Sequence, residues 1–133
     1  MNKKNIQAKE YVAFQGKRFV IEWYFDERGR SPSADYFELL NEDEQIKTLG
    51  LFELMGNLGE IRNQTKFNTE GDKIYAFKPQ PHRFLCFFFS GGKIVVTNAF
   101  HKKTNKLPVG EKKRALSYKE DYEIRVKRGN YYE

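Results

Sequence analysis

Residues 73–100 read KIYAFKPQPHRFLCFFFSGGKIVVTNAF, and this stretch decides the fold. It contains three runs rich in β-branched and aromatic residues, which are typical of strands, so we predict strands over 73–78, 83–89 and 93–100. The links between them, Pro-Gln-Pro and Ser-Gly-Gly, are too short for a parallel crossover, so neighbouring strands must be antiparallel. The middle run is apolar on both faces and is expected at the centre of the sheet.

The first 60 residues add one predicted strand and two predicted helices. Residues 18–25 (RFVIEWYF) favour a strand. Ser31 followed by Pro32 is typical of a helix start, with serine as N-cap and proline at the first helical position. Asn41 with Glu44 three residues later indicates a second start, closed by a capping box. Apolar residues then recur every three positions, which predicts one buried stripe. The stripe consists of Ile46, Leu49, Phe52, Met55 and Leu58.

Pro108 marks the start of a last helix, which places Ala115, Tyr118 and Tyr122 on one face. The predicted order is β-α-α-β-β-β-α. This order indicates an α+β fold, a small antiparallel sheet with the two N-terminal helices packed on one face. We expect one domain over residues 17–122, preceded over 1–16 by a polar segment that forms a loose arm or a short edge element, and followed by a basic tail over 123–133.

Charge is distributed unevenly along the 133 residues, whose net charge is +6. Residues 1–60 hold 8 Lys/Arg and 11 Asp/Glu, a net of −3, whereas residues 61–133 hold 16 and 7, a net of +9. Basicity confined to one half predicts a positive face that attracts a polyanion, although a solvated basic surface without a partner would have the same composition. No apolar stretch approaches the roughly 20 residues that span a bilayer, and the N-terminus does not resemble a signal peptide. We therefore expect a cytoplasmic protein without a membrane partner.

Several motifs in the second half resemble a known group of proteins. They are KIYAFK (73–78), HRFL (82–85), FFSGGKIVV (88–96), AFHKKTNKLP (99–108) and EKKRALSYKEDY (111–122). Together they resemble the RelE/ParE toxin superfamily, in particular its phage-derived, HigB-like branch, over residues 19–122. The most specific part is the Lys-Lys-Thr-x-Lys-x-Pro turn followed by a helix that ends in Asp-Tyr.

The resemblance implies a RelE-like fold and the toxin half of a type II toxin–antitoxin pair. It implies a metal-independent, ribosome-dependent endoribonuclease that cuts messenger RNA and thereby inhibits translation. The expected partners are the ribosome, messenger RNA and a cognate antitoxin of the helix-turn-helix type, with no cofactor. Two alternatives stay open: a ParE-like inhibitor of DNA gyrase, and a catalytically inactive module that binds nucleic acid or an antitoxin.

The expected catalytic residues are Arg83, His101, Lys102 and Lys103. Arg83 matches the family arginine that holds the scissile phosphate, and its guanidinium offers a bidentate fork that lysine lacks. His101 is expected to serve as general acid or base, since imidazole titrates near neutral pH. Strand neighbours alternate, so one of Lys102 and Lys103 should face the site, but the sequence leaves open which one does.

Further basic and aromatic residues are expected to bind RNA. These residues are Lys73, Lys78, Lys106, Lys112, Lys113, Arg114, Tyr118 and Tyr122. For the two tyrosines, packing against the sheet is the alternative to stacking on a base. The sequence also departs from the superfamily pattern, because RelE carries a lysine pair in the strand that here places Ile74, Ala76 and Lys78 at alternating positions. The two histidines and the single cysteine have no metal-site spacing.

Overall fold

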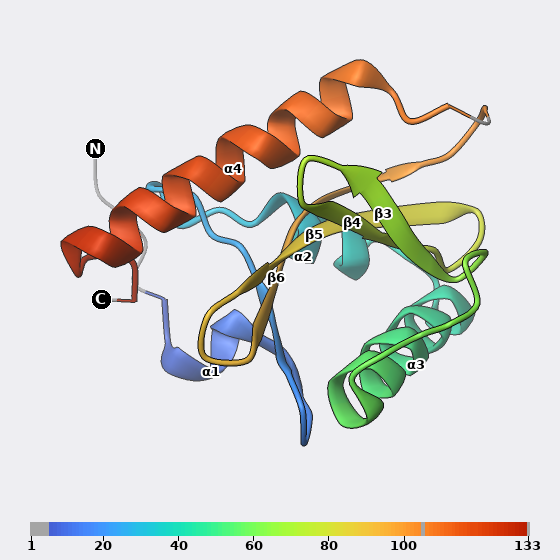
Figure 1. The fold of residues 1–133 in the computed structure, drawn as a ribbon, viewed down its shortest axis with the longest axis horizontal. Coiled ribbons are helices and arrows are strands. Elements are labelled where there is room, and N and C mark those ends of the chain that lie inside the picture. Colours follow the sequence, from blue (N-terminus) through green and yellow to red (C-terminus); the bar gives the residue numbers. More distant parts are fainter. Residues whose placement is uncertain (1–5, 105, 133) are drawn as a thin grey trace.

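The computed structural model describes residues 6–104 and 106–132, which form an α+β fold around one six-stranded sheet (Figure 1). The strands are β1 (Val12–Gln15), β2 (Val20–Trp23), β3 (Phe67–Gly71), β4 (Ile74–Phe77), β5 (His82–Phe89) and β6 (Lys93–His101). The helices are α1 (Ala8–Tyr11), α2 (Pro32–Glu38), α3 (Glu42–Leu58) and α4 (Val109–Arg128). Residues 1–5 of the predicted arm, Asn105 of the lysine-rich turn and the last residue of the predicted tail lie outside the described residues.

The strand order is β1-β2-β6-β5-β4-β3. The three-strand meander is confirmed, with β5 between β4 and β6 and both pairs antiparallel. The predicted α+β fold is confirmed, but the sheet is mixed rather than antiparallel throughout, because β2 pairs with β6 in parallel from Val20↔Lys93 to Trp23↔Val96. About 70 residues separate β2 from β6, and a connection of that length allows either a parallel or an antiparallel pair. No local turn signal therefore fixes the direction of pairing.

The structure adds two edge strands, β1 and β3; β1 is the short edge element that was one of two alternatives for residues 1–16, whereas β3 was not predicted. β1 belongs to the segment expected as a polar arm or a short edge element, and β3 (FNTEG) to a segment expected as a loop. Both are short, and in β3 only the residues after buried Phe67 alternate, between half-buried and exposed positions. A strand that pairs on one side only can be polar and short, so its sequence pattern is weak.

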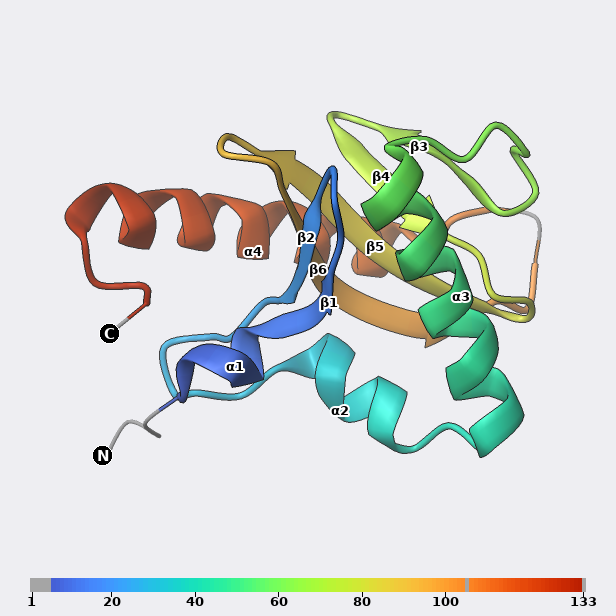
Figure 2. The same ribbon diagram turned by 90° about the horizontal axis from the view of Figure 1, so that it is seen from below.

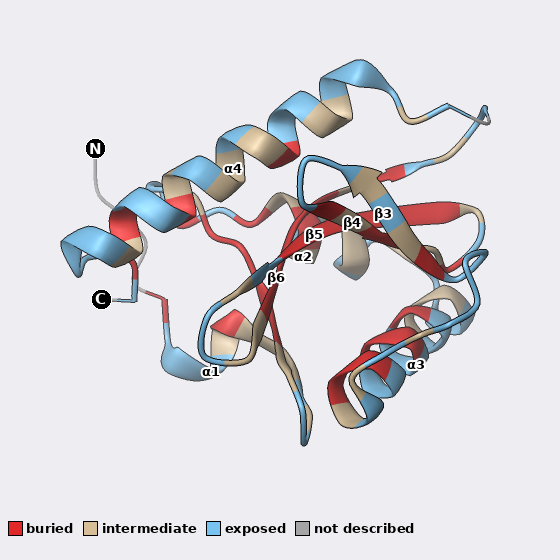
Figure 3. Ribbon diagram, viewed as in Figure 1, coloured by how far each residue is buried: buried red, intermediate tan, exposed pale blue. Residues whose placement is uncertain are grey.

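Helices cover both faces of the sheet, α2 and α3 on one side and α4 on the other (Figure 2). Phe84 on β5 contacts the rings of Trp23 and Phe52 on the α3 side. Phe87 lies three residues further along β5, so its side chain is on the opposite face of the sheet, where it contacts the ring of Tyr122 of α4. The alternation of β5 side chains therefore divides the core into two layers, and Figure 3 shows the central strands as its most buried part.

The predicted stripe of α3 is only partly correct. Phe52 and Met55 are buried, whereas Ile46 and Leu58 are 60% and 61% exposed. Three helical residues turn through about 300°, so a strict three-residue repeat drifts around the helix and leaves the core face. The apolar residues at both ends of the repeat consequently face solvent.

The C-terminal segment packs onto the body of the protein. Helix α4 continues to Arg128, so the predicted boundary between residues 122 and 123 falls inside it. Tyr131 follows the helix, is 1% exposed, and accepts a hydrogen bond at its hydroxyl from the Phe25 N–H (2.9 Å). The Tyr11 hydroxyl donates to the Tyr131 carbonyl (3.1 Å). None of the described helices is long and apolar enough to cross a membrane.

Candidate anion-binding site

A small pocket of about 100 Å³ opens where β3, β4, β5 and the end of β6 meet the loop that precedes α4. Its wall contains four cations and one carboxylate. The lining residues are Asn68, Glu70, Lys78, Arg83, Phe100, Lys102, Lys106 and Leu107. We refer to it as the anion pocket.

Arg83 is the most enclosed of the four cations and is 5% exposed. Its Nη1 donates to the Gln80 side-chain oxygen (3.1 Å) and to the His82 carbonyl (2.9 Å). Within the described residues, Nε and Nη2 donate no hydrogen bond to the protein. Burial lowers the pKa of Arg83, and the Glu70 carboxylate acts in the opposite direction. A guanidinium held at one nitrogen, with other donors unused, is suited to bind a phosphate at this pocket.

Lys78 and Lys102 approach the same pocket from two other segments. Lys78 Nζ donates to the Gln64 carbonyl (3.1 Å). Its pKa is lowered chiefly by burial and further by the positive charges of Arg83 and Lys102, while Glu70 raises it. The Lys102 N–H donates to the Pro81 carbonyl (2.9 Å), which fixes the backbone just after β6. The charges of Arg83 and Lys102 thus act against the charge of Lys78, and an anion bound among these three cations would offset that repulsion.

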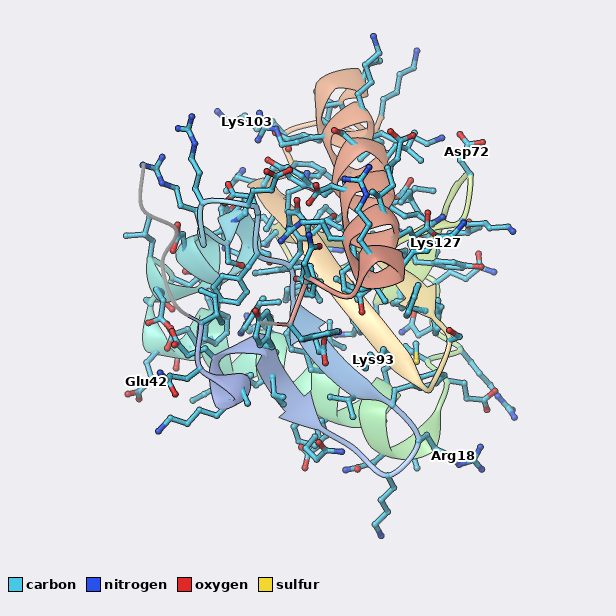
Figure 4. All side chains as sticks on the ribbon, turned by 90° about the vertical axis from the view of Figure 1, so that its left-hand side faces the viewer. Arg18, Glu42, Asp72, Lys93, Lys103 and Lys127 are labelled. Carbon is cyan, nitrogen blue, oxygen red and sulfur yellow. The ribbon has the colours of Figure 1, made fainter. Side chains whose placement is uncertain are left out.

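Lys103 points away from this pocket. It is exposed and is not among the lining residues, and Figure 4 shows it at the periphery of the molecule. The geometry therefore selects Lys102 rather than Lys103 as the lysine that faces Arg83.

His101 lies on the opposite face of the sheet from Arg83. In the β5–β6 ladder His82 pairs with His101 and Arg83 pairs with Phe100, and paired residues share a face. The two histidine rings are accordingly 5.6 Å apart. The structure does not bring His101 together with Arg83 and Lys102.

His82 belongs to a polar cluster that the sequence did not reveal. Its Nδ1 is 2.7 Å from the Tyr36 hydroxyl, and its Nε2 is 2.6 Å from a Glu44 carboxylate oxygen. The hydrogen bond from His82 lowers the pKa of Glu44, helped by the Asn41 N–H of the predicted capping box. The cluster joins α2 and α3 to the start of β5.

The remaining predicted RNA contacts are dispersed. Lys106 lines the anion pocket, whereas Lys73 is exposed in the β3–β4 turn. Lys112 pairs with Asp72 (2.8 Å), which stands at the tip of that turn (Figure 4). Along the first turns of α4, Lys113 is exposed and Arg114 lies 3.6 Å from Glu111.

The two tyrosines of α4 pack against the protein. Tyr118 is half-buried and stacks on Tyr24, with ring centroids 4.8 Å apart. Tyr122 is 0% exposed, and burial raises its pKa to about 12. The Tyr122 ring is therefore inaccessible to a nucleotide base, which corrects its assignment as an RNA contact.

The model of the phage-derived Gp49-like protein family (DUF891) matches residues 35–120. The chain belongs to this family. The Gp49-like family is part of the RelE/ParE-like toxin superfamily, which is consistent with a toxin of a toxin–antitoxin system and suggests an antitoxin partner. No curated protein matches the chain. The matched segment contains every residue of the anion pocket and leaves β1, β2 and the end of α4 outside.

Sequence reasoning missed four residues that line the pocket in this Gp49-like protein, two of them polar and two apolar: Asn68, Glu70, Phe100 and Leu107. The polar pair, Asn68 and Glu70, lies on β3, two positions apart and hence on one face, but the strand was expected as a loop. Asn68 Oδ1 is buried and has no hydrogen-bond partner within the described residues. The one sequence signal for this pair was their spacing of two residues between Phe67 and Gly71, which is the period of a strand. No group of His, Cys, Asp and Glu in the described part of the chain is arranged to hold a metal ion.

Proposed function

We propose that this Gp49-like protein is a toxin that cleaves messenger RNA on the ribosome without a metal ion. The observation that supports the proposal is the convergence of Lys78, Arg83 and Lys102 on a pocket that also contains Glu70. A pocket of about 100 Å³ suits a phosphate group rather than a larger ligand. The cations would bind the scissile phosphodiester, and Arg83 would supply the directional hydrogen bonds.

The same residues suggest a cleavage chemistry. Glu70 would accept the proton of the ribose 2′-hydroxyl, whose oxygen then attacks phosphorus. The new 2′-O–P bond forms as the P–O5′ bond breaks, which leaves a cyclic phosphate and a 5′-hydroxyl. Lys78 would donate a proton to the departing O5′, and its lowered pKa makes it a better acid than an exposed lysine. Arg83 and Lys102 would stabilise the negative charge that grows on the phosphoryl oxygens.

Asn68 favours RNA over DNA as the substrate. Its buried Oδ1 accepts no hydrogen bond from the described residues, and it lies in the wall of the anion pocket. A buried acceptor is stabilised by a donor. A ribose 2′-hydroxyl is such a donor beside a phosphate, and deoxyribose lacks it. This feature supports a nuclease rather than a gyrase inhibitor.

The test is induced expression in bacteria, with primer extension on a reporter messenger RNA. The wild type should arrest growth and produce new cuts inside translated codons, whereas Arg83→Ala and Glu70→Gln should produce neither. Arg83→Lys keeps the charge of the enclosed site and should also fail, because lysine cannot offer two parallel donors. Thermal unfolding of each purified variant separates lost chemistry from lost folding.

Other outcomes of this experiment would overturn the proposal in defined ways. Growth arrest with intact message and double-strand DNA breaks would identify a gyrase inhibitor. The absence of arrest with the folded wild type would identify an inactive binding module. Cuts that persist in Arg83→Ala would place the chemistry outside the anion pocket.

A further inference from the structure

A second depression, the α3 groove, lies between α3 and the segment 60–66 and has a volume of about 740 Å³. Its floor and walls are largely apolar. They contain Leu51, Leu54, Leu58 and Ile61. Leu54 is 39% exposed and Leu58 is 61% exposed, so packing in the core does not account for leucine at these two positions. A smaller depression of about 320 Å³ shares Leu51 and Lys66 with it and extends the groove along α3 to Lys47.

Gly50 lines this extension, in the middle of α3. A glycine inside a helix lowers helix stability relative to alanine, so it requires a reason. At Gly56 the reason is internal, because a Cβ there would lie 2.8 Å from the Phe14 ring. At Gly50 a Cβ would meet nothing within 4 Å. The missing side chain instead keeps the groove open, so that another backbone can approach closely.

The rim of the groove is positively charged. Lys47, Arg62 and Lys66 line it, and its one carboxylate, Glu60, already pairs with Arg62 (2.9 Å). In residues 6–104 and 106–132, neither Lys47 nor Lys66 forms a close ion pair, although the charge of Lys47 acts on the Glu44 carboxylate one helical turn away. An apolar floor flanked by lysines without a close ion pair is complementary to an apolar ridge between acidic residues.

We propose that the α3 groove binds an amphipathic helix of a partner protein, with an apolar ridge and acidic flanks. The groove runs along residues 47–58 of α3, and at 3.6 residues per turn this length allows about three helical turns of contact. The groove shares no lining residue with the anion pocket. The inference therefore goes beyond the proposed nuclease and needs no RNA cleavage to be correct.

The test uses two fluorescent 18-residue peptides, each held helical by a lactam bridge. Both carry leucines at positions i, i+4, i+7 and i+11, flanked by Glu in one peptide and by Lys in the other. Fluorescence anisotropy with the full chain should show at least tenfold tighter binding of the Glu peptide. Gly50→Gln should weaken that binding at least tenfold, because its side chain fills the groove. Leu49→Gln is the matched control, since Leu49 is on α3 but does not line the groove, and it should bind as the wild type does.

Folding of the variants is checked independently. Gln is a better helix former than Gly, so Gly50→Gln and Gly50→Ala should both unfold at a higher temperature than the wild type. Equal binding of the two peptides, no binding of either, or unchanged binding by Gly50→Gln would overturn the proposal. A wild-type dimer in sedimentation velocity that Gly50→Gln abolishes would overturn it in favour of a second copy of the chain. Because no RNA is present, failure here is distinct from failure of the nuclease test.

Discussion

At the scale of single residues, the chemistry depends on which face of β5 a side chain occupies. Arg83 and His82 are adjacent in sequence, yet Arg83 faces the anion pocket while His82 bonds Tyr36 and Glu44 on the other side. The same alternation on β6 places Phe100 beside Arg83 and His101 beside His82. The proposed chemistry therefore involves Glu70 and Lys78 rather than His101.

Lys102 and Lys103 offer a matched pair of substitutions. Lys102→Ala should lower the rate of messenger RNA cleavage on the order of 10²-fold, because one cation is removed from the proposed transition-state site. Lys103→Ala removes the same charge from an exposed position and should leave the rate within about twofold, since it lies outside the pocket. The measurement is the initial cleavage rate on translating ribosomes with both purified variants. Equal losses would show that only the overall positive field matters.

At the scale of elements, the segment between α3 and β3 supports the site. The Gln64 carbonyl holds Lys78, and the Thr65 carbonyl accepts a hydrogen bond from the Gln80 amide (3.3 Å). The side-chain oxygen of Gln80 in turn accepts a hydrogen bond from the Arg83 guanidinium. The position of the guanidinium thus depends on a loop that belongs to neither β4 nor β5.

Removing the Gln80 link should loosen Arg83 without unfolding the protein. We expect Gln80→Ala to lower the cleavage rate by about tenfold, because a catalytic group loses a preorganising hydrogen bond. Its melting temperature should change little, since the Gln80 side chain is exposed. Gln64→Ala is the control, because Gln64 contributes only its backbone carbonyl to the site. An unchanged rate in Gln80→Ala would contradict the supporting role.

The contact between α3 and β5 predicts a dependence of stability on pH. The hydrogen bond from His82 lowers the folded-state pKa of Glu44 below its ordinary value of 4.5. A lowered pKa means that the unfolded chain binds this proton more readily, so the contribution is present above pH 4.5 and is lost as the pH falls through the lowered value. Urea unfolding at pH 6 and at points below pH 4.5 should show a smaller acid-induced loss of stability in Glu44→Gln than in the wild type. Glu42→Gln, on the same turn but outside the His82 contact, should behave as the wild type does.

At the scale of the whole molecule, the two ends of the described chain lie on the same side, as both Figure 1 and Figure 2 show. Tyr131 contacts the rings of Tyr11 and Tyr122, and the Arg125 guanidinium lies 4.6 Å from the Tyr131 ring centre. This cluster joins the end of α4 to α1 and to the residues after β2.

Tyr131→Ala should therefore destabilise the folded protein by about 3 kcal/mol, as expected for a buried aromatic ring replaced by a cavity. The free energy of unfolding in urea measures this effect. Lys127→Ala, on the exposed face of α4, should change it by less than about 0.5 kcal/mol. A small effect of Tyr131→Ala would mean that the C-terminal segment is dispensable, as expected for a tail outside the domain.

The sequence by itself determined the β4–β5–β6 meander, the helix starts at Ser31 and Asn41 and the family resemblance. These features follow from local chemistry, namely apolar β-branched runs, short turns and N-cap residues that act within a few positions. Only the tertiary structure decided the parallel β2–β6 pair and the edge strands β1 and β3. It also decided that Glu70 and Lys102 face Arg83 while His101 does not. The physical reason is register: the face that a side chain occupies depends on how distant strands align, including the irregularity between Leu85 and Cys86, and no local signal fixes that alignment.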